Sequence, residues 1–256
     1  MFDPLSTFRL DGKVVIITGA SSGLGARFAR VCDAAGASLV LAARRVERLE
    51  SLANGLSNAV VVRADLAHDE AVPAIIEAAL SEFGAIDVVV NNAGISRTVK
   101  AVDDDLEDFR RELQIDLVAP YDLARRAAHV MIEGGRPGSI INIASVLGQV
   151  AGGPLPLPGY AAAKGGLVHL TRELASEWAL NAIRVNGIGP GWFESEMTKD
   201  AMFDTDRGQE FIRRGAPMGR AGQEHELDGA LLYLASDASS YMTGQTLYVD
   251  GGWTII

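Results

Sequence analysis

The sequence of 256 residues contains very little cysteine and histidine. Its one cysteine, Cys32, excludes an internal disulfide and a metal site built from cysteines. The four histidines are scattered without the spacing of metal ligands, so we expect no metal site. Positive charge is also scarce: the net charge of −10 argues against nucleic acid as a partner, because phosphates repel an acidic surface.

Long hydrophobic runs are missing as well, and no secretory leader segment is expected. No run reaches the roughly 18 apolar residues that a membrane span needs. The first residues lack the basic and apolar regions of a secretory signal. We therefore expect no membrane partner and a cytoplasmic protein. With 48% hydrophobic and 22% charged residues, the composition is typical of a globular protein with a substantial core.

Short apolar runs alternate with helical patterns along the chain. Most of these runs are apolar at consecutive positions, as in strands buried on both faces of a parallel sheet. The expected strands cover residues 13–19, 38–44, 59–65, 86–92, 138–145, 183–190 and 245–252. The expected helices cover residues 23–35, 45–57, 69–83, 104–133, 159–180 and 224–236.

This alternation predicts an α/β fold, a single doubly wound Rossmann-type domain over residues 1–256. Its sheet would have about seven parallel strands, with helices on both faces. Residues 192–222 are too long for a plain connection, and we interpret them as a lid on the substrate side that holds short helices.

Three glycines follow the first expected strand in "TGASSGLG" with the spacing G-x-x-x-G-x-G. Such glycines permit a tight turn and close approach of phosphates, and the following helix offers free N–H groups to an anion. We interpret the motif as a dinucleotide-binding turn, with a purely structural turn as the alternative. The residues expected to contact the cofactor there are Gly19, Ser21, Ser22, Gly23, Leu24 and Gly25.

The end of the second expected strand bears on the choice of cofactor. Ala43 stands where an acidic residue would hold the ribose of NAD, and Arg44 and Arg45 follow it. This pattern favours NADP(H), with NAD(H) possible; the alternative is that the arginines form a solvated helix start.

Further candidates follow the third and fourth strands. Asp65 could accept the adenine amino group or cap the next turn, and the Asn of "NNAG" could face the cofactor or shape a turn. The cofactor candidates at these two strand ends are Asp65, Leu66, Asn92, Ala93 and Gly94.

Tyr160 and Lys164 are four residues apart in "GYAAAKGG", within an expected helix. Side chains at this spacing lie on one face of a helix, one turn apart. The small residues around them would let a ligand or another backbone approach closely. The pair alone is compatible with chemistry or with packing.

Together, "TGASSGLG", "NNAG", "INIAS", "YAAAK", "GPGW" and "YVDGG" resemble the ordered motifs of the short-chain dehydrogenase/reductase family, from about Leu10 to Gly252. The resemblance implies that Ser145 hydrogen-bonds the substrate oxygen and that Tyr160 is the general acid/base. Lys164 would lower the pKa of Tyr160 and bind the nicotinamide ribose. The resemblance also implies a homotetramer.

The same resemblance assigns "GPGWFESEM" to the nicotinamide-binding loop. Its candidates are Pro190, Gly191, Phe193 and Ser195. Ser195 stands where a threonine hydroxyl is usual in the family, and it could also cap a helix that begins with Glu196.

Simple electrostatics supports the tyrosine–lysine pair. Moving a phenol pKa from about 10 to about 7 requires about 4 kcal/mol, and an ammonium about 4 Å away contributes about that much. There is one departure from the family: Asp116 occupies the position of its catalytic asparagine. If the backbone carbonyl serves the proton relay, this is tolerable; otherwise a carboxylate would alter proton transfer, in part by pairing with Lys164.

We therefore expect an oxidoreductase that transfers a hydride between NADP(H) and a carbonyl or secondary alcohol of a small molecule. Apolar residues in 146–159 and 192–211 favour a hydrophobic substrate, with a subunit interface as the alternative. A 3-oxoacyl thioester reductase is the alternative enzyme. A non-catalytic NADP-binding sensor is the remaining alternative.

Overall fold

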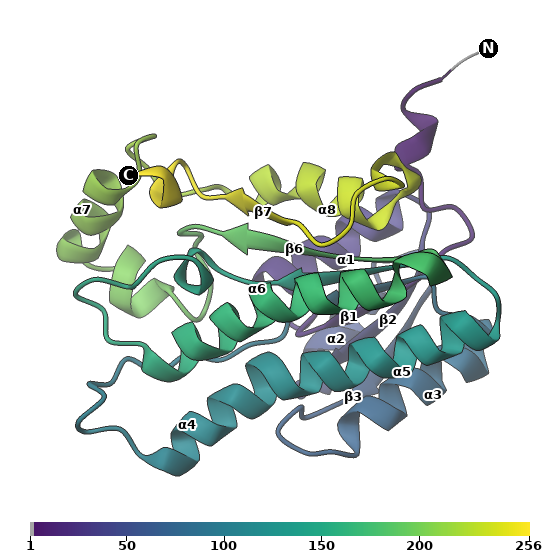
Figure 1. Cartoon of the computed structure of the whole chain (residues 1–256), viewed down its shortest axis with the longest axis horizontal. Helices are drawn as coiled ribbons and strands as arrows, with labels where there is room; N and C mark the ends of the chain where they lie inside the picture. Colours follow the sequence, from purple (N-terminus) through teal and green to yellow (C-terminus); the bar gives the residue numbers. More distant parts are fainter. Residues whose placement is uncertain (1–2) are drawn as a thin grey trace.

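Seven parallel strands form one sheet in the computed structural model, which describes residues 3–256 (Figure 1). The strands are β1 (Val14–Thr18), β2 (Ser38–Ala43), β3 (Ala59–Arg63), β4 (Val88–Asn91), β5 (Gly138–Ile143), β6 (Ile183–Pro190) and β7 (Thr246–Val249). Their order in the sheet is β3-β2-β1-β4-β5-β6-β7. The chain order reverses between β1 and β4, and a crevice for ligands is expected at the carboxyl ends of such strands. The predicted fold class is confirmed.

Helices cover both faces because alternate strand residues point to opposite sides. Ile16 of β1 belongs to the core beneath the helices α3, α5 and α6, whereas Val15 and Ile17 belong to the core beneath α1, α2 and α8. The helices are α1 (Gly23–Ala34), α2 (Val46–Ala53), α3 (Ala71–Phe83), α4 (Leu106–Leu113), α5 (Ala119–Glu133), α6 (Pro158–Trp178), α7 (Asp206–Gly215) and α8 (Asp228–Ala235). This arrangement leaves the carboxyl ends of the strands free to carry a site.

The helix expected over residues 104–133 is interrupted by a wide π-helical turn, Gln114–Val118, between α4 and α5. Pro120 has no N–H to donate to the carbonyl of Asp116, so a regular α-helical bond cannot form at this point. The interruption therefore falls on a predicted site residue.

Residues 192–222 contain a π-helical turn, Lys199–Phe203, and α7. In Figure 1, α7 lies at the same end of the molecule as the C-terminus. The ring of Trp192 packs against Phe211 of α7 at 5.9 Å and against Trp253 of the C-terminal tail at 5.6 Å. The C-terminal tail therefore packs against residues 192–222 through the ring of Trp253. Within residues 3–256, no helix has the length and apolar character needed to cross a membrane.

Candidate active site

A cavity of about 520 Å³ follows the carboxyl ends of the strands. Its wall combines the turn between β1 and α1, the ends of β2 to β5, and the segment after β6. The predicted residues on this wall are Gly19, Ser21, Ser22, Gly23, Leu24, Gly25, Arg44, Arg45, Asp65, Leu66, Asn92, Ala93, Gly94, Ser145, Tyr160, Lys164, Pro190, Gly191, Phe193 and Ser195. Asp116 is fully buried behind the wall. The structure gathers these residues at one place, and their individual roles stay predictions.

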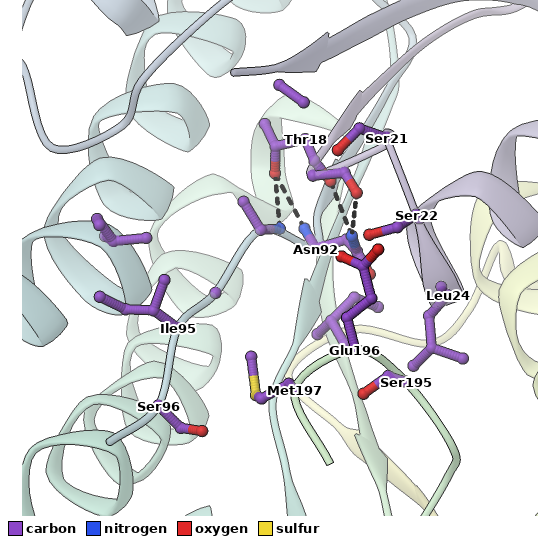
Figure 2. A pocket seen from close by; sticks show the side chains of 18 of the residues that line it. Thr18, Ser21, Ser22, Leu24, Asn92, Ile95, Ser96, Ser195, Glu196 and Met197 are labelled. Carbon is purple, nitrogen blue, oxygen red and sulfur yellow. Dashed lines mark hydrogen bonds between the residues drawn. The ribbon is translucent and has the colours of Figure 1, made fainter. Parts of the chain in front are cut away.

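The glycine turn leaves no room for side chains at two positions. A Cβ on Gly19 would lie 2.8 Å from the Cα of Ala93, and one on Gly25 would lie 2.4 Å from the carbonyl oxygen of Gly19. Asn92 holds this turn because its Nδ2 donates to the carbonyl of Thr18 at 2.9 Å (Figure 2). The side chain of Asn92 therefore shapes the turn. The N-terminus of α1 begins here, and its first N–H groups are free to bind an anion.

Tyr160 and Lys164 lie on the same face of α6, as their spacing predicts. The Nζ of Lys164 is 5.4 Å from the centroid of the Tyr160 ring. It also donates to the carbonyl of Ile143, at the end of β5, at 3.0 Å. Ser145 follows the same strand, and its Oγ accepts a hydrogen bond from the N–H of Leu147 at 3.1 Å. A strand end and a helix therefore fix the hydroxyl, the phenol and the ammonium group.

The pKa of Tyr160 is raised above its ordinary value, chiefly by burial. The Lys164 ammonium and the Ser145 hydroxyl lower this pKa, whereas the Asp116 carboxylate raises it. Burial lowers the pKa of Lys164, but Asp116 and Tyr160 outweigh it, and the net pKa is raised. The lysine thus keeps its charge. Lys164 lowers the pKa of Tyr160, as expected, but in the polypeptide alone burial and Asp116 outweigh this effect.

Asp116 pairs with Lys164, as considered from the sequence. Its Oδ2 is 3.3 Å from the Nζ of Lys164 without forming a hydrogen bond, and its Oδ1 accepts from the N–H of Ile95 at 2.9 Å. Burial raises the pKa of Asp116, while the lysine charge and the Ile95 N–H lower it. The side chain therefore fixes the backbone that follows β4 and partly neutralises the charge of Lys164.

Glu112 is a second buried carboxylate that the sequence reasoning missed. It lies one turn before Asp116, and its Oε1 accepts from the N–H of Arg97 at 2.7 Å. Its Oε2 has no hydrogen-bond partner and would lie 2.1 Å from a Cβ on Gly159, next to Tyr160. Burial raises the pKa of Glu112, although the Arg97 N–H opposes this. In the sequence, only its spacing of four residues from Asp116 indicates that Glu112 lies on the same helix face.

Arg45 and Asp65 occupy the other end of the cavity. The Nη2 of Arg45 donates to the Oγ of Ser22 at 2.7 Å and to that of Ser21 at 3.2 Å, so this arginine lies against the glycine turn. The interpretation of Arg45 as only a solvated helix start is therefore too simple. The Oδ1 of Asp65 accepts from the N–H of Ala67 at 3.2 Å, which is the capping alternative considered from the sequence.

The segment after β6 is organised by a threonine that the sequence reasoning missed. The Thr198 hydroxyl accepts from the N–H of Ser195 at 3.0 Å and donates to the carbonyl of Phe193 at 2.8 Å. The helix that Ser195 could have capped does not begin at Glu196; a turn there leads into the π-helical turn Lys199–Phe203. Thr198 also lines the cavity.

The apolar residues expected around the substrate are only partly at the cavity. Phe193 and Met197 line it, together with Ile95 and Ser96 from the segment after β4. Trp192 and Phe211 instead belong to the aromatic cluster on the C-terminal tail. Of residues 146–159, none is on the wall. Fewer apolar side chains therefore line the substrate side of the cavity than the sequence predicted.

A family model described as "Enoyl-(Acyl carrier protein) reductase" matches residues 19–254. The 2-dehydro-3-deoxy-D-gluconate 5-dehydrogenase of Escherichia coli (strain K12) is 36% identical over 97% of this chain and 98% of its own. The 3beta-hydroxysteroid dehydrogenase 1 of Eggerthella lenta is 37% identical over 96% of this chain and 95% of its own.

A solved gluconate 5-dehydrogenase from Burkholderia cenocepacia J2315, in complex with NADP and tartrate, has a TM-score of 0.92 and 36% identity. The similarity covers 99% of this chain and 100% of that chain. The chain belongs to the short-chain dehydrogenase/reductase family. As a member of this family it is an oxidoreductase, and the similarity that the motifs predicted is confirmed.

Proposed function

We propose that the protein is an NADP(H)-dependent oxidoreductase that acts on the carbonyl group or secondary alcohol of a small, neutral and partly apolar substrate. One observation carries the proposal: Ser145, Tyr160 and Lys164 lie on the wall of the same cavity as the glycine turn and Arg45. A cofactor held at one end of that cavity would reach a proton donor at the other.

The residues present fit a nicotinamide dinucleotide. The turn from Gly19 to Gly25 has backbone where a Cβ would clash, and the N-terminus of α1 can bind its phosphates. Arg45 lies beside this turn and suits a 2′-phosphate, since a guanidinium binds phosphate with two parallel hydrogen bonds. The NADP of the Burkholderia relative supports this choice. When bound, the dinucleotide supplies the hydride donor or acceptor and, in its oxidised form, a positive charge.

The chain itself supplies orientation and a proton. The Ser145 Oγ already accepts a hydrogen bond from Leu147, so its own proton can be donated to a substrate oxygen. Tyr160 would transfer its hydroxyl proton to that oxygen in reduction and remove it in oxidation. Lys164, held by Ile143, would stabilise the phenolate form.

The charge distribution of the cavity supports a neutral substrate. Among the described residues on its wall, the cationic side chains are Arg44, Arg45 and Lys164. On the substrate side, Ile95 and Met197 are apolar. Arg97 lies nearby, but its guanidinium pairs with Asp104 at 3.1 Å and Asp108 at 3.0 Å. The carboxylate of a sugar acid would have no free cation there.

Similarity to named relatives does not choose the substrate. The sugar-acid dehydrogenase and the steroid dehydrogenase are almost equally identical to this chain, at 36% and 37%. The choice of substrate therefore depends on the residues at the site, and these favour a neutral substrate over a sugar acid.

The proposal is tested by following nicotinamide absorbance with NADPH and NADH in parallel. The substrate panel contains neutral alicyclic ketones, keto sugar acids and 3-oxoacyl thioesters, with Tyr160→Phe as the background control. We expect turnover with NADPH and neutral ketones. A preference for NADH would overturn the cofactor assignment, and a preference for keto acids or thioesters would overturn the substrate class.

We also propose that the protein is a cytoplasmic homotetramer with residues 192–222 as a substrate-side lid. Apolar side chains on α5 and the π-helical turn before it support an interface, since Val118, Tyr121 and Ile132 are 45%, 43% and 41% exposed. Light scattering on the purified protein measures the assembly, and a monomer would contradict it.

A further inference from the structure

The cavity contains one charged contact that the proposed reaction does not use. The Oε2 of Glu196 accepts from the Nη1 of Arg45 at 2.8 Å, and its Oε1 accepts from the Nη1 of Arg48. Hydrogen bonds from Arg48 and Arg45 lower the pKa of Glu196 to about 2. The carboxylate is therefore ionised throughout the neutral range. It occupies the guanidinium of Arg45, on the cavity wall at the end proposed for the 2′-phosphate, and that of Arg48, which is outside the wall.

The same contact joins two parts of the cavity wall. Arg45 donates to Glu196 with one nitrogen and to Ser22 of the glycine turn with another. The segment 194–198, which we call the latch segment, lies over that turn: a Cβ on Gly23 would be 3.6 Å from the Cβ of Ser195. Figure 2 shows Glu196 reaching toward Ser22. Arg45 thus ties the latch segment to the phosphate-binding turn.

We propose that Glu196 competes with the 2′-phosphate of the cofactor for Arg45 and Arg48, and that this competition makes it a specificity-determining residue. NADP(H) would displace Glu196 and release the latch segment. NAD(H), which carries a hydroxyl at that position, would leave the contact in place. The inference rests on the proposed use of NADP(H).

Two physical arguments favour competition over joint binding. Phosphate and carboxylate would seek the same donors of Arg45, and two anions at one guanidinium repel each other. The contact is also weak enough to exchange, because the side chains of Glu196 and Arg45 are 53% and 41% exposed. A phosphate monoester brings up to two negative charges, so it can replace a single carboxylate.

Calorimetric binding of adenosine 2′,5′-bisphosphate and 5′-AMP tests the competition without the nicotinamide. In Glu196→Gln we expect about three- to tenfold tighter binding of the bisphosphate, from the loss of two exposed ion pairs. Binding of 5′-AMP should change less than about twofold. Glu194→Gln is the matched control, since Glu194 belongs to the same segment but pairs with Lys199; it should bind both probes like the wild type.

Hydrogen–deuterium exchange of residues 194–203 gives a second readout. Without nucleotide, this segment should exchange faster in Glu196→Gln than in the wild type. In the wild type, the bisphosphate should accelerate exchange there and 5′-AMP should not. Unchanged exchange in Glu196→Gln would contradict the claim that Glu196 holds the latch segment against the glycine turn.

The binding results also separate this inference from the proposed function. Weaker binding of the bisphosphate to Glu196→Gln, or equal tightening of both probes, would overturn the competition. Equal affinity of the wild type for the two probes would instead overturn the preference for NADP(H), whereas faster exchange in the variant without nucleotide would still support the latch.

Discussion

Two carboxylate–cation pairs in this cavity region carry the same charges and differ in their access to water. The side chains of Asp116 and Lys164 are 0% and 4% exposed at a separation of 3.3 Å, whereas those of Glu196 and Arg45 are 53% and 41% exposed at 2.8 Å. The buried pair is longer, yet it changes the pKa values of Tyr160 and Lys164. The exposed pair is shorter and screened by solvent. The buried pair acts on the pKa of the proposed proton donor, Tyr160, whereas its exposure to water lets the other pair exchange partners.

The largest effect on activity is expected from removing the Tyr160 hydroxyl, whose pKa the buried pair changes. Tyr160→Phe removes the proton donor and should lower kcat by about 10²- to 10⁴-fold, with intact binding of dinucleotide. Steady-state kinetics and calorimetric titration measure the two quantities. Turnover near the wild-type rate would contradict the assignment of Tyr160 as the proton donor.

Replacing the cation of each pair compares their contributions to stability. Lys164→Met leaves Asp116 buried without a counter-ion and should lower the free energy of unfolding by about 3–5 kcal/mol. Arg45→Met should change it by less than about 1 kcal/mol. Urea denaturation measures both.

The double variant Asp116→Asn/Lys164→Met sharpens the comparison, since it should regain part of the lost stability. Equal losses in the two single variants would contradict the role assigned to burial.

A smaller effect is expected when the carboxylate of the buried pair loses its charge. Asp116 raises the pKa of Tyr160, so Asp116→Asn should lower that pKa. Alcohol oxidation needs the deprotonated phenol, so its rate rises with pH through the Tyr160 pKa, and this rising limb of the profile should move to lower pH. We expect activity at neutral pH to be kept or raised. A pH–rate profile of kcat checks the shift, and a collapse to background would show that the carboxylate is required.

Replacing Glu112 should have the smallest effect. It tests a buried carboxylate whose Oε2 has no hydrogen-bond partner among the described residues. Because burial raises its folded-state pKa above 4.5, its stabilising contribution is full below pH 4.5 and is lost as the pH rises through the folded value. Glu112→Gln keeps an acceptor for the Arg97 N–H and should remove this pH dependence. The stability difference between variant and wild type should grow from pH 5 to pH 8, by less than about 1 kcal/mol. A difference that is independent of pH would contradict the raised pKa.

The sequence predicted the features that depend on local pattern. Seven apolar runs gave seven strands, and the motif glycines placed the turn before α1. Tyr160 and Lys164 share a face because helix geometry alone sets that relation. The break at Gln114–Val118 was missed, since apolar periodicity continues on both sides of Pro120.

Features that depend on contacts between distant segments were not predictable. Glu196 is an ordinary surface glutamate until the fold brings Arg45 and Arg48 to it. The burial of Glu112 arises where α4 meets the start of α6, and Trp192 leaves the substrate side because Trp253 is available to it. In each case a partner far along the chain decides the role of the residue.

The packing of Trp253 has a practical consequence for handling the protein. The last residues of the chain pack against α7: a Cβ on Gly215 of α7 would lie 2.3 Å from the Trp253 ring. An affinity tag fused after Ile256 would disturb this contact, and removing the final four residues would delete it, because Trp253 is one of them. Expression vectors for this enzyme should therefore carry their tag at the N-terminus.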